Sequence, residues 1–458
     1  MSRAPLRAAC APLAVAVLCL LPGGARGETL ALTGATVHPG SGPTLEHATV
    51  VIADGRIAAV GADLATPPGA RVVPCQGKHI CPGFISPYGA LGLIEISSVR
   101  GTNDWAETGD VNPNIRAEVQ INPESDLIPV ARVNGITSAL IVPRGGTLNG
   151  SSALVHMDGW TYEDMTIRAP VGLHVQWPAM GIVHDRRETR SEEEQKKQRD
   201  EAIAGVHKAF DDARAYWKAR EAENRTGIPR HDRDAKWEAM GRALKGEIPV
   251  FFHLSALNQI HAVLRFVDEE KLKNVVLVDA YDAGSAVEEL KRRDIAVIVG
   301  PVLALPRRSW EPYDQAMTLP ARLHAAGVRF CISDGGGAGD AMNARNLPYH
   351  AAMAAAYGLP RDQALKAITL YPAQILGVAE RLGSIEPGKI ADLVVADGDP
   401  LEITSHIEQV YIGGRAMSME TRQTRLFHKY DQRPRGSSRP LPDAAVPAAG
   451  AGKGGRTH

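Results

Sequence analysis

Two histidines and two aspartates stand out because each lies in, or at the end of, a short apolar run. They are His174, His253, Asp279 and Asp334. If these runs are strands of one barrel, their carboxyl ends converge and the four side chains come within reach of one another. Four nitrogen and oxygen ligands satisfy zinc. The pattern therefore predicts one divalent metal, with zinc as the best match.

Such a site would perform hydrolysis. An open coordination position lowers the pKa of bound water toward 7, and Asp334 could take a proton from that water and pass it to the leaving group. The glycines at 335–337 favour an open strand end beside this aspartate. The alternatives are structural: a lone histidine at a strand end is more often simply hydrogen-bonded, and Asp334 could cap the following helix.

The elements that must position these residues are apolar runs separated by helical stretches. Such runs are typical of strands buried on both faces in parallel βα units. With a further strand at 83–86 and an eighth that is harder to place, they predict an α/β fold with a (β/α)8 barrel. A doubly wound open sheet is the alternative, although no glycine-rich phosphate loop follows the first strand. The runs are 138–142, 172–177, 249–254, 274–279, 295–299 and 329–334.

Short strands at both chain ends predict a small composite β-sandwich from residues 28–80 and 383–425. Asp54-Gly55 lies between two apolar runs and is a strong hairpin signal. Neither set of strands is large enough to form a core alone. The barrel is then expected to occupy residues 81–382.

Three further segments have compositions of their own. Residues 186–247 mix charges of both signs, which predicts a solvated helical insertion without a catalytic role. Residues 431–458 are rich in Pro, Gly and Ala and predict a disordered tail. Residues 1–27 combine a basic start, an apolar run and small residues, which is typical of a secretory signal peptide. The protein is therefore expected to be exported, to the periplasm or outside the cell; a membrane anchor is the alternative.

The composition excludes some partners. Lys+Arg 51 against Asp+Glu 52 leaves no basic excess for binding a nucleic acid. No later segment is apolar enough to span a membrane. Beyond the leader, the cysteines are Cys75, Cys81 and Cys331. They are expected to be structural thiols, with a Cys75–Cys81 disulfide as the alternative.

Motifs at both ends of the mature chain resemble those of one family. The first set comprises residues 32–37 (LTGATV), 54–57 (DGRI) and 82–85 (PGFI), and the second is 383–394 (GSIEPGKIADLV). Together and in this order they resemble the amidohydrolase superfamily, in particular its imidazolonepropionase-like and Xaa-Pro-dipeptidase-like branch. The resemblance implies a distorted (β/α)8 barrel with a small β-sandwich.

The metal motif that the resemblance implies is degraded. After Pro-Gly-Phe-Ile the family carries Asp-x-His-x-His, whereas this chain has Ser86, Tyr88 and Ala90 at those positions. Both histidines are lost. A binuclear centre of the family type is therefore not expected.

The other family ligands are kept or exchanged. His253 and Asp334 match a family histidine and a family aspartate. His174 stands where a carboxylated lysine often bridges two metals, and Asp279 stands where the family has histidine. The resemblance therefore implies one divalent metal on these four residues, or none.

Two functions follow. The first is a hydrolase of C–N amide bonds, in a dipeptide or a non-peptide amide, with an atypical metal site. Asp334 would act as base and then acid, Tyr88 would polarise the carbonyl, and Arg144 and Arg345 would bind a substrate carboxylate. The alternative is an inactive homologue that serves as a binding module or as the partner of an active paralogue. The expected partners are a small-molecule substrate or ligand and a second subunit, in a homodimer or a heteromer with that paralogue.

Overall fold

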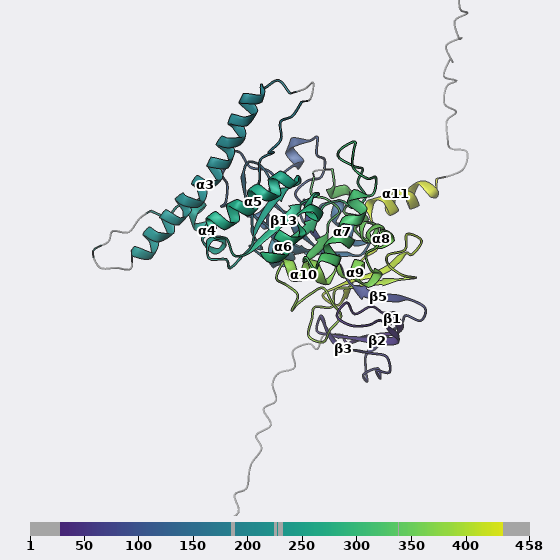
Figure 1. Cartoon of the computed structure of the whole chain (residues 1–458). Coiled ribbons are helices and arrows are strands. Elements are labelled where there is room, and N and C mark those ends of the chain that lie inside the picture. The colour runs from purple at the N-terminus through teal and green to yellow at the C-terminus, as the bar shows by residue number, and fades with distance from the viewer. Residues whose placement is uncertain (1–27, 185–187, 224–226, 228–231, 338, 434–458) are drawn as a thin grey trace, which may run out of the picture.

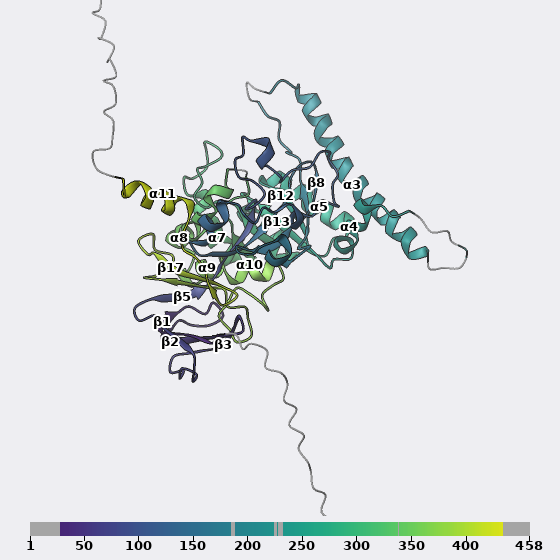
Figure 2. The same cartoon turned by 180° about the vertical axis from the view of Figure 1, so that it is seen from behind.

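The computed structural model describes residues 28–433, except 185–187, 224–226, 228–231 and 338. Figure 1 shows a body of strands and helices with a strand-rich unit at one end and the long helix α3 projecting elsewhere; Figure 2 shows the same from behind. The expected signal peptide and most of the expected disordered tail lie outside the described residues. No helix in the described part of the chain is long and apolar enough to cross a membrane.

The strand-rich unit is one eight-stranded sheet assembled from both ends of the chain. Its order is β18-β17-β16-β5-β1-β2-β3, with β4 beside β1. The antiparallel pairing of β16 with β5 joins the C-terminal strands to the N-terminal ones. The strands are β1 Leu30–Val37, β2 Leu45–Ala53, β3 Arg56–Gly61, β4 Arg71–Pro74, β5 His79–Pro82, β16 Leu393–Ala396, β17 Ile407–Ile412 and β18 Arg415–Ala416.

The β2–β3 hairpin follows directly from its turn residues. Asp54 and Gly55 have φ angles of 50° and 75°, as a type I′ turn requires, and glycine adopts such angles without strain. Ala53 therefore pairs with Arg56 on the two sides of the turn. The predicted hairpin is confirmed.

The remaining strands form two sheets in the described residues. One has the order β10-β9-β7-β6 and the other β15-β14-β13-β12-β11-β8. In the second, β11 to β15 are parallel neighbours, and nearly all of their residues are buried. The strands are β6 Phe84–Gly89, β7 Ile136–Ile141, β8 Leu148–Ser151, β9 Ala153–His156, β10 Thr166–Arg168, β11 Leu173–Gln176, β12 Val250–Leu254, β13 Val275–Asp279, β14 Ala296–Val299 and β15 Phe330–Ile332.

The fold is a mixed α/β fold with a barrel-like arrangement of parallel strands. The two sheets meet where β15 approaches β6, and the Ser86 hydroxyl there donates a 3.0 Å hydrogen bond to Asp334. In the described residues no backbone ladder joins β15 to β6, so closure of the predicted eight-stranded barrel is not shown.

Helices alternate with the parallel strands, which positions successive strand ends on one side of the sheet. They are α1 Leu127–Arg132, α2 Tyr162–Met165, α5 Leu257–Glu270, α6 Val287–Arg292, α7 Gln315–Ala326, α8 Leu347–Ala356, α9 Arg361–Lys366 and α10 Leu370–Ile375. Four 3-10 turns, η1 Arg100–Thr102, η2 Ala117–Gln120, η3 Ala283–Ser285 and η4 Ala341–Asn346, complete the connections.

Two helices fall in the segment for which charge patterning predicts an insertion. They are α3 Glu192–Ala222 and α4 Ala235–Leu244, and they pack against each other. A capping box between Ser191 and Glu194 fixes the start of α3. Outside this segment, near the C-terminal end of the described residues, helix α11 Arg422–Asp431 has no buried residue and was not expected from the sequence. The predicted domain boundaries stay a prediction.

The three described cysteines are free and buried. Burial in apolar surroundings raises the pKa of all three thiols. The increase takes the pKa of Cys81 and Cys331 beyond the ordinary range of a thiol. The alternative of a Cys75–Cys81 disulfide is therefore wrong for this structure, and the expectation of structural thiols is confirmed.

Candidate functional site

The ends of β6, β11, β12 and β15 bring a small set of polar side chains together. Ser86 and Tyr88 come from β6, His174 from β11, His253 from β12, and Asp334 follows β15. All five are at most 5% exposed. We call these residues, with Arg144 from the loop after β7, the barrel mouth.

The two histidines hydrogen-bond to each other. His174 Nδ1 and His253 Nε2 are 2.8 Å apart, and Phe251 stacks on the His174 ring with centroids 4.6 Å apart. Burial, with a contribution from nearby Arg144, lowers the pKa of His174 to about 3, and burial also holds the pKa of His253 well below its usual range. Both rings are therefore neutral at physiological pH, and one donates to the other.

Asp334 is held by its neighbour across the gap between the sheets. Ser86 Oγ donates to Asp334 Oδ1 at 3.0 Å. Burial raises the pKa of Asp334 to about 8, although the hydrogen bonds from its own backbone and from Ser86 act in the opposite direction. This carboxyl group therefore exchanges its proton close to neutral pH.

Tyr88 fills the centre of the barrel mouth. Its ring lies 5.0 Å from that of His253, and its edge packs on the backbone of Gly336 so closely that a Cβ atom there would overlap it. A glycine at position 336 is thus required by this close approach. The Tyr88 hydroxyl has no hydrogen-bond partner in the described part of the chain, nor do His174 Nε2 and His253 Nδ1.

Asp279 makes no hydrogen bond with the histidine pair, although β13, which carries it, pairs with the strand of His253. It ends β13 with φ 70°, a left-handed conformation that is uncommon outside glycine, and its carboxylate contacts the backbone of Gly300 at the end of β14. Burial raises its pKa, and the nearby Arg307 and Arg144 lower it in part. Asp279 therefore lies near enough to Arg144 to interact with its charge, although it is not bonded to the histidine pair.

The predicted metal ligands do not fit a metal in this arrangement. The described residues contain no group of three or more His, Cys, Asp or Glu side chains placed to hold an ion. The structure brings His174 and His253 together, but they are bonded to each other. Asp334 is engaged by Ser86, and Asp279 is not grouped with these side chains as a possible ligand. The donor set thus lacks the three protein ligands of a catalytic zinc site.

The two predicted carboxylate-binding arginines have different locations. The Arg144 guanidinium lies over the Tyr88 ring at 5.3 Å and over the Trp105 ring at 5.2 Å, so it is part of the barrel mouth. Arg345 is exposed on η4, where its carbonyl accepts a hydrogen bond from Asn134 beside the start of β7. That is the opposite end of β7 from the barrel mouth, so the geometry does not favour Arg345 as a substrate ligand.

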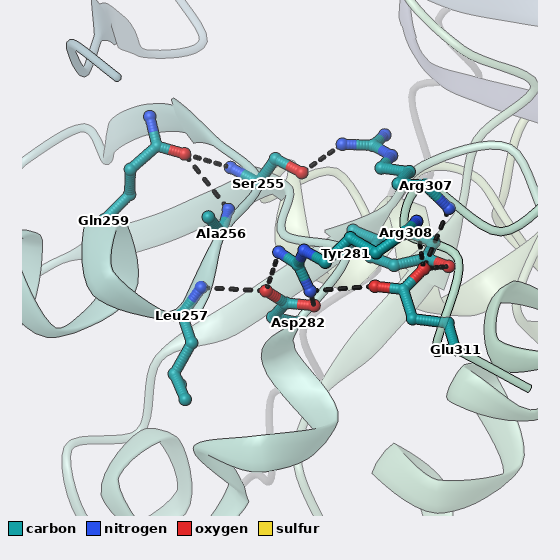
Figure 3. A network of polar contacts seen from close by, with 9 residues as sticks. All are labelled: Ser255, Ala256, Leu257, Gln259, Tyr281, Asp282, Arg307, Arg308 and Glu311. Carbon is teal, nitrogen blue, oxygen red and sulfur yellow. Dashed lines mark hydrogen bonds and ion pairs between the residues drawn. The ribbon is translucent and has the colours of Figure 1, made fainter. Parts of the chain in front are cut away.

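A polar network that the sequence did not reveal fixes the loops beside the barrel mouth (Figure 3). Arg308 makes a bidentate ion pair with Asp282 at 2.6 and 3.0 Å and also contacts Glu311 at 2.8 Å. Tyr281 donates to Glu311 at 2.9 Å, and Asp282 also accepts from the Leu257 amide. The network ties the loops after β12, β13 and β14 together. Mixed Arg and acidic residues at 307–314 were the only signal for it.

The structure defines a mixed α/β protein with a barrel-like arrangement of parallel strands, and the comparisons narrow this class. Residues 235–417 match the amidohydrolase family. An amidohydrolase from Thermotoga maritima MSB8 is 27% identical with a TM-score of 0.76, over 85% of this chain and 99% of that one. These similarities support the assignment of the chain to the amidohydrolase superfamily.

One further relative matches this chain in sequence, and one further solved structure shares its fold. Amidohydrolase tasK of Hapsidospora irregularis is 25% identical over 76% of this chain, and the match spans only 37% of that protein's length. Phenylurea hydrolase B is 17% identical with a TM-score of 0.51, over 86% of this chain and 97% of that one, and shows a shared fold.

Proposed function

We propose that the chain hydrolyses a C–N bond of a small amide, such as a dipeptide or a non-peptide amide, at the barrel mouth. The observation that carries this proposal is the position of Asp334: a buried carboxyl group that follows a strand end and is hydrogen-bonded to Ser86, which shares β6 with Tyr88. Membership of the superfamily supports the same reaction class. The proposed branch is the imidazolonepropionase-like and Xaa-Pro-dipeptidase-like one.

In this reaction Asp334 accepts a proton from the attacking water and returns it to the leaving nitrogen. Its ionised form is the base, and a pKa of about 8 leaves a minor ionised fraction at neutral pH. The Tyr88 hydroxyl donates to the carbonyl oxygen as negative charge develops there. The neutral histidine pair lines the same space and offers one free nitrogen on each ring. No step is assigned to a metal, because the donor set does not fit one.

The test is turnover of a panel of dipeptides, N-acyl amino acids and cyclic amides by the full chain. Asp334→Asn should lower kcat/KM by about a hundredfold or more, the usual contribution of a general base. Leu426 is partly exposed on helix α11, so Leu426→Ala serves as the control and should leave kcat/KM unchanged. Turnover that survives Asp334→Asn would remove this residue from the mechanism, and a panel without turnover would refute the proposal.

A second candidate is a non-catalytic binding protein, alone or as partner of an active paralogue. The observation that favours it is the set of possible metal ligands. The two retained family ligands, His253 and Asp334, are hydrogen-bonded to other side chains. Tyr88 and Ala90 stand in place of the two family histidines after Pro-Gly-Phe-Ile. Ligand binding without turnover by the same panel would establish this function.

We also propose that the protein is exported. The proposal rests on residues 1–27 and their pattern of basic, apolar and small residues. N-terminal sequencing of the protein from the periplasmic fraction should start at Glu28. A retained Met1 would exclude cleavage.

A further inference from the structure

Arg144 is held in place by its backbone and by two aromatic rings. Its amide donates to the Trp105 carbonyl at 2.6 Å, and an isolated bridge pairs it with Ala106. The guanidinium lies over the rings of both Tyr88 and Trp105, at 5.3 and 5.2 Å from their centroids. Stacking on aromatic faces is a geometry that arginine favours and lysine does not share.

The stacked guanidinium has no acceptor. Among the described residues no carboxylate lies within ion-pair distance of Arg144, and none of its side-chain N–H groups makes a hydrogen bond there. Asp279 and Asp340 attract it only from a longer distance. Withdrawing a charge from water without a partner costs free energy. A fixed, partly buried guanidinium whose N–H groups lack a partner is therefore suited to bind an anion.

The same cluster leaves no place for a metal ion. The Tyr88 ring occupies the end of β6 where a first ligand would stand, with Gly336 packed on its edge. His174 and His253 use their facing nitrogens on each other. A divalent cation at this place would also lie beside the guanidinium of Arg144, and like charges disfavour one another at short range.

We propose that Arg144, and not a metal ion, is the cationic centre of the barrel mouth, and that it binds the carboxylate of an anionic ligand. A carboxylate matches the two parallel N–H groups of a guanidinium. The Tyr88 hydroxyl and the free nitrogen of His253 are the unpartnered groups of the same cluster that would face the rest of the ligand. The inference concerns binding at the proposed site and holds with or without turnover.

The first experiment measures metal uptake by the full chain. After loading with zinc and removal of free ions, elemental analysis should find below about a tenth of an equivalent of zinc. The reason is that the site does not offer the three protein ligands that a catalytic zinc needs. The double variant Tyr88→His, Ala90→His should take up markedly more zinc. One equivalent in the unchanged protein, lost in His253→Ala, would overturn the inference. A double variant that stays free of zinc would refute the role given to Tyr88.

The second experiment measures carboxylate binding with sodium benzoate as the probe. Benzoate should raise the Tm of the full chain in a saturable way, and Arg144→Gln should weaken its Kd by about tenfold or more, as the loss of a charge-assisted pair does. Arg265→Gln, on the exposed face of α5, is the matched control and should bind like the unchanged protein. Equal binding by Arg144→Gln, or no binding by the unchanged protein, would refute the carboxylate site.

Discussion

At the residue scale, Asp334 shows how burial and hydrogen bonding compete on one group. The Ser86 hydroxyl favours the ionised carboxylate, yet removal from water favours the neutral acid and has the larger effect, so the pKa rises to about 8. The Asp334 carboxyl is therefore proton-bound in the folded protein at a pH where the unfolded chain has lost that proton. This difference links the stability of the fold to pH.

Asp334→Asn should remove a pH dependence of stability between pH 6.5 and 8. Because the folded pKa lies above the unfolded one, the stabilising proton is fully present at low pH and is lost as the pH rises through about 8. The free energy of unfolding of the unchanged protein should fall by up to about 1.4 kcal/mol per pH unit from this group. Urea unfolding of both proteins at several pH values checks it. Parallel profiles would contradict the prediction.

The sequence predicted these residues better than their interactions. His174, His253 and Asp334 do lie at converging strand ends, because alternating apolar runs and helices fix that geometry. The contact between the two rings and the packing of Tyr88 on Gly336 depend on side-chain directions across strands. No single strand encodes such contacts, so the expected four-ligand metal set could not be tested without the structure.

At the element scale, strand ends supply most side chains of the barrel mouth, and polar contacts fix the loop after β14. The segment after β14 is fixed at one point by the Arg308 network and at another by His350 of α8, whose Nδ1 accepts the amides of Val302 and Leu303 at 3.1 and 3.2 Å. Burial lowers the pKa of His350 to about 4. Only the neutral ring can accept these hydrogen bonds.

Acid should loosen the loop after β14 through His350. Its folded pKa lies below the unfolded value of 6.5, so its contribution to stability is present at higher pH and is lost as the pH falls through about 4. The exchange protection of the Val302 and Leu303 amides should fall between pH 6.5 and 4. His350→Gln, which does not titrate, should abolish this pH dependence, and His261→Gln on α5 is the control. Unchanged protection down to pH 4 would refute the role of His350.

The element-level predictions succeeded where a local signal was decisive. Asp54-Gly55 specifies its hairpin because few residues tolerate the required φ angles. The helix α11 was not anticipated, since it buries none of its residues and thus lacks an apolar face tied to the core. The Arg308 network joins three loops that are separated along the chain, and sequence spacing carries no information about such pairs.

At the scale of the whole molecule, the strand-rich unit couples the two chain ends. Its core includes Leu30, Leu32 and Ile80 from the first strands and Leu393 and Val395 from the last. None of these side chains is more than 3% exposed. The two sets of strands therefore share one core, and neither retains its packing without the other.

Leu393→Ala should destabilise the chain by about 2–5 kcal/mol, because it opens a cavity in this shared core. Leu426→Ala, on α11 at 38% exposure, should change stability by less than about 0.5 kcal/mol. Urea unfolding followed by circular dichroism measures both. Equal stabilities of the two variants would show that the β16 contacts do not contribute as the burial implies.

The junction of the chain ends also sets an order of events during synthesis. The Arg56 side chain hydrogen-bonds the carbonyl of Gly388, a residue 332 positions later in the chain. The first strands can pair with one another early, but they are synthesised long before the C-terminal strands that share their core. Until the last strands are made, the apolar side chains of β1 and β2 lack part of their core, which leaves these strands open to pairing with other chains.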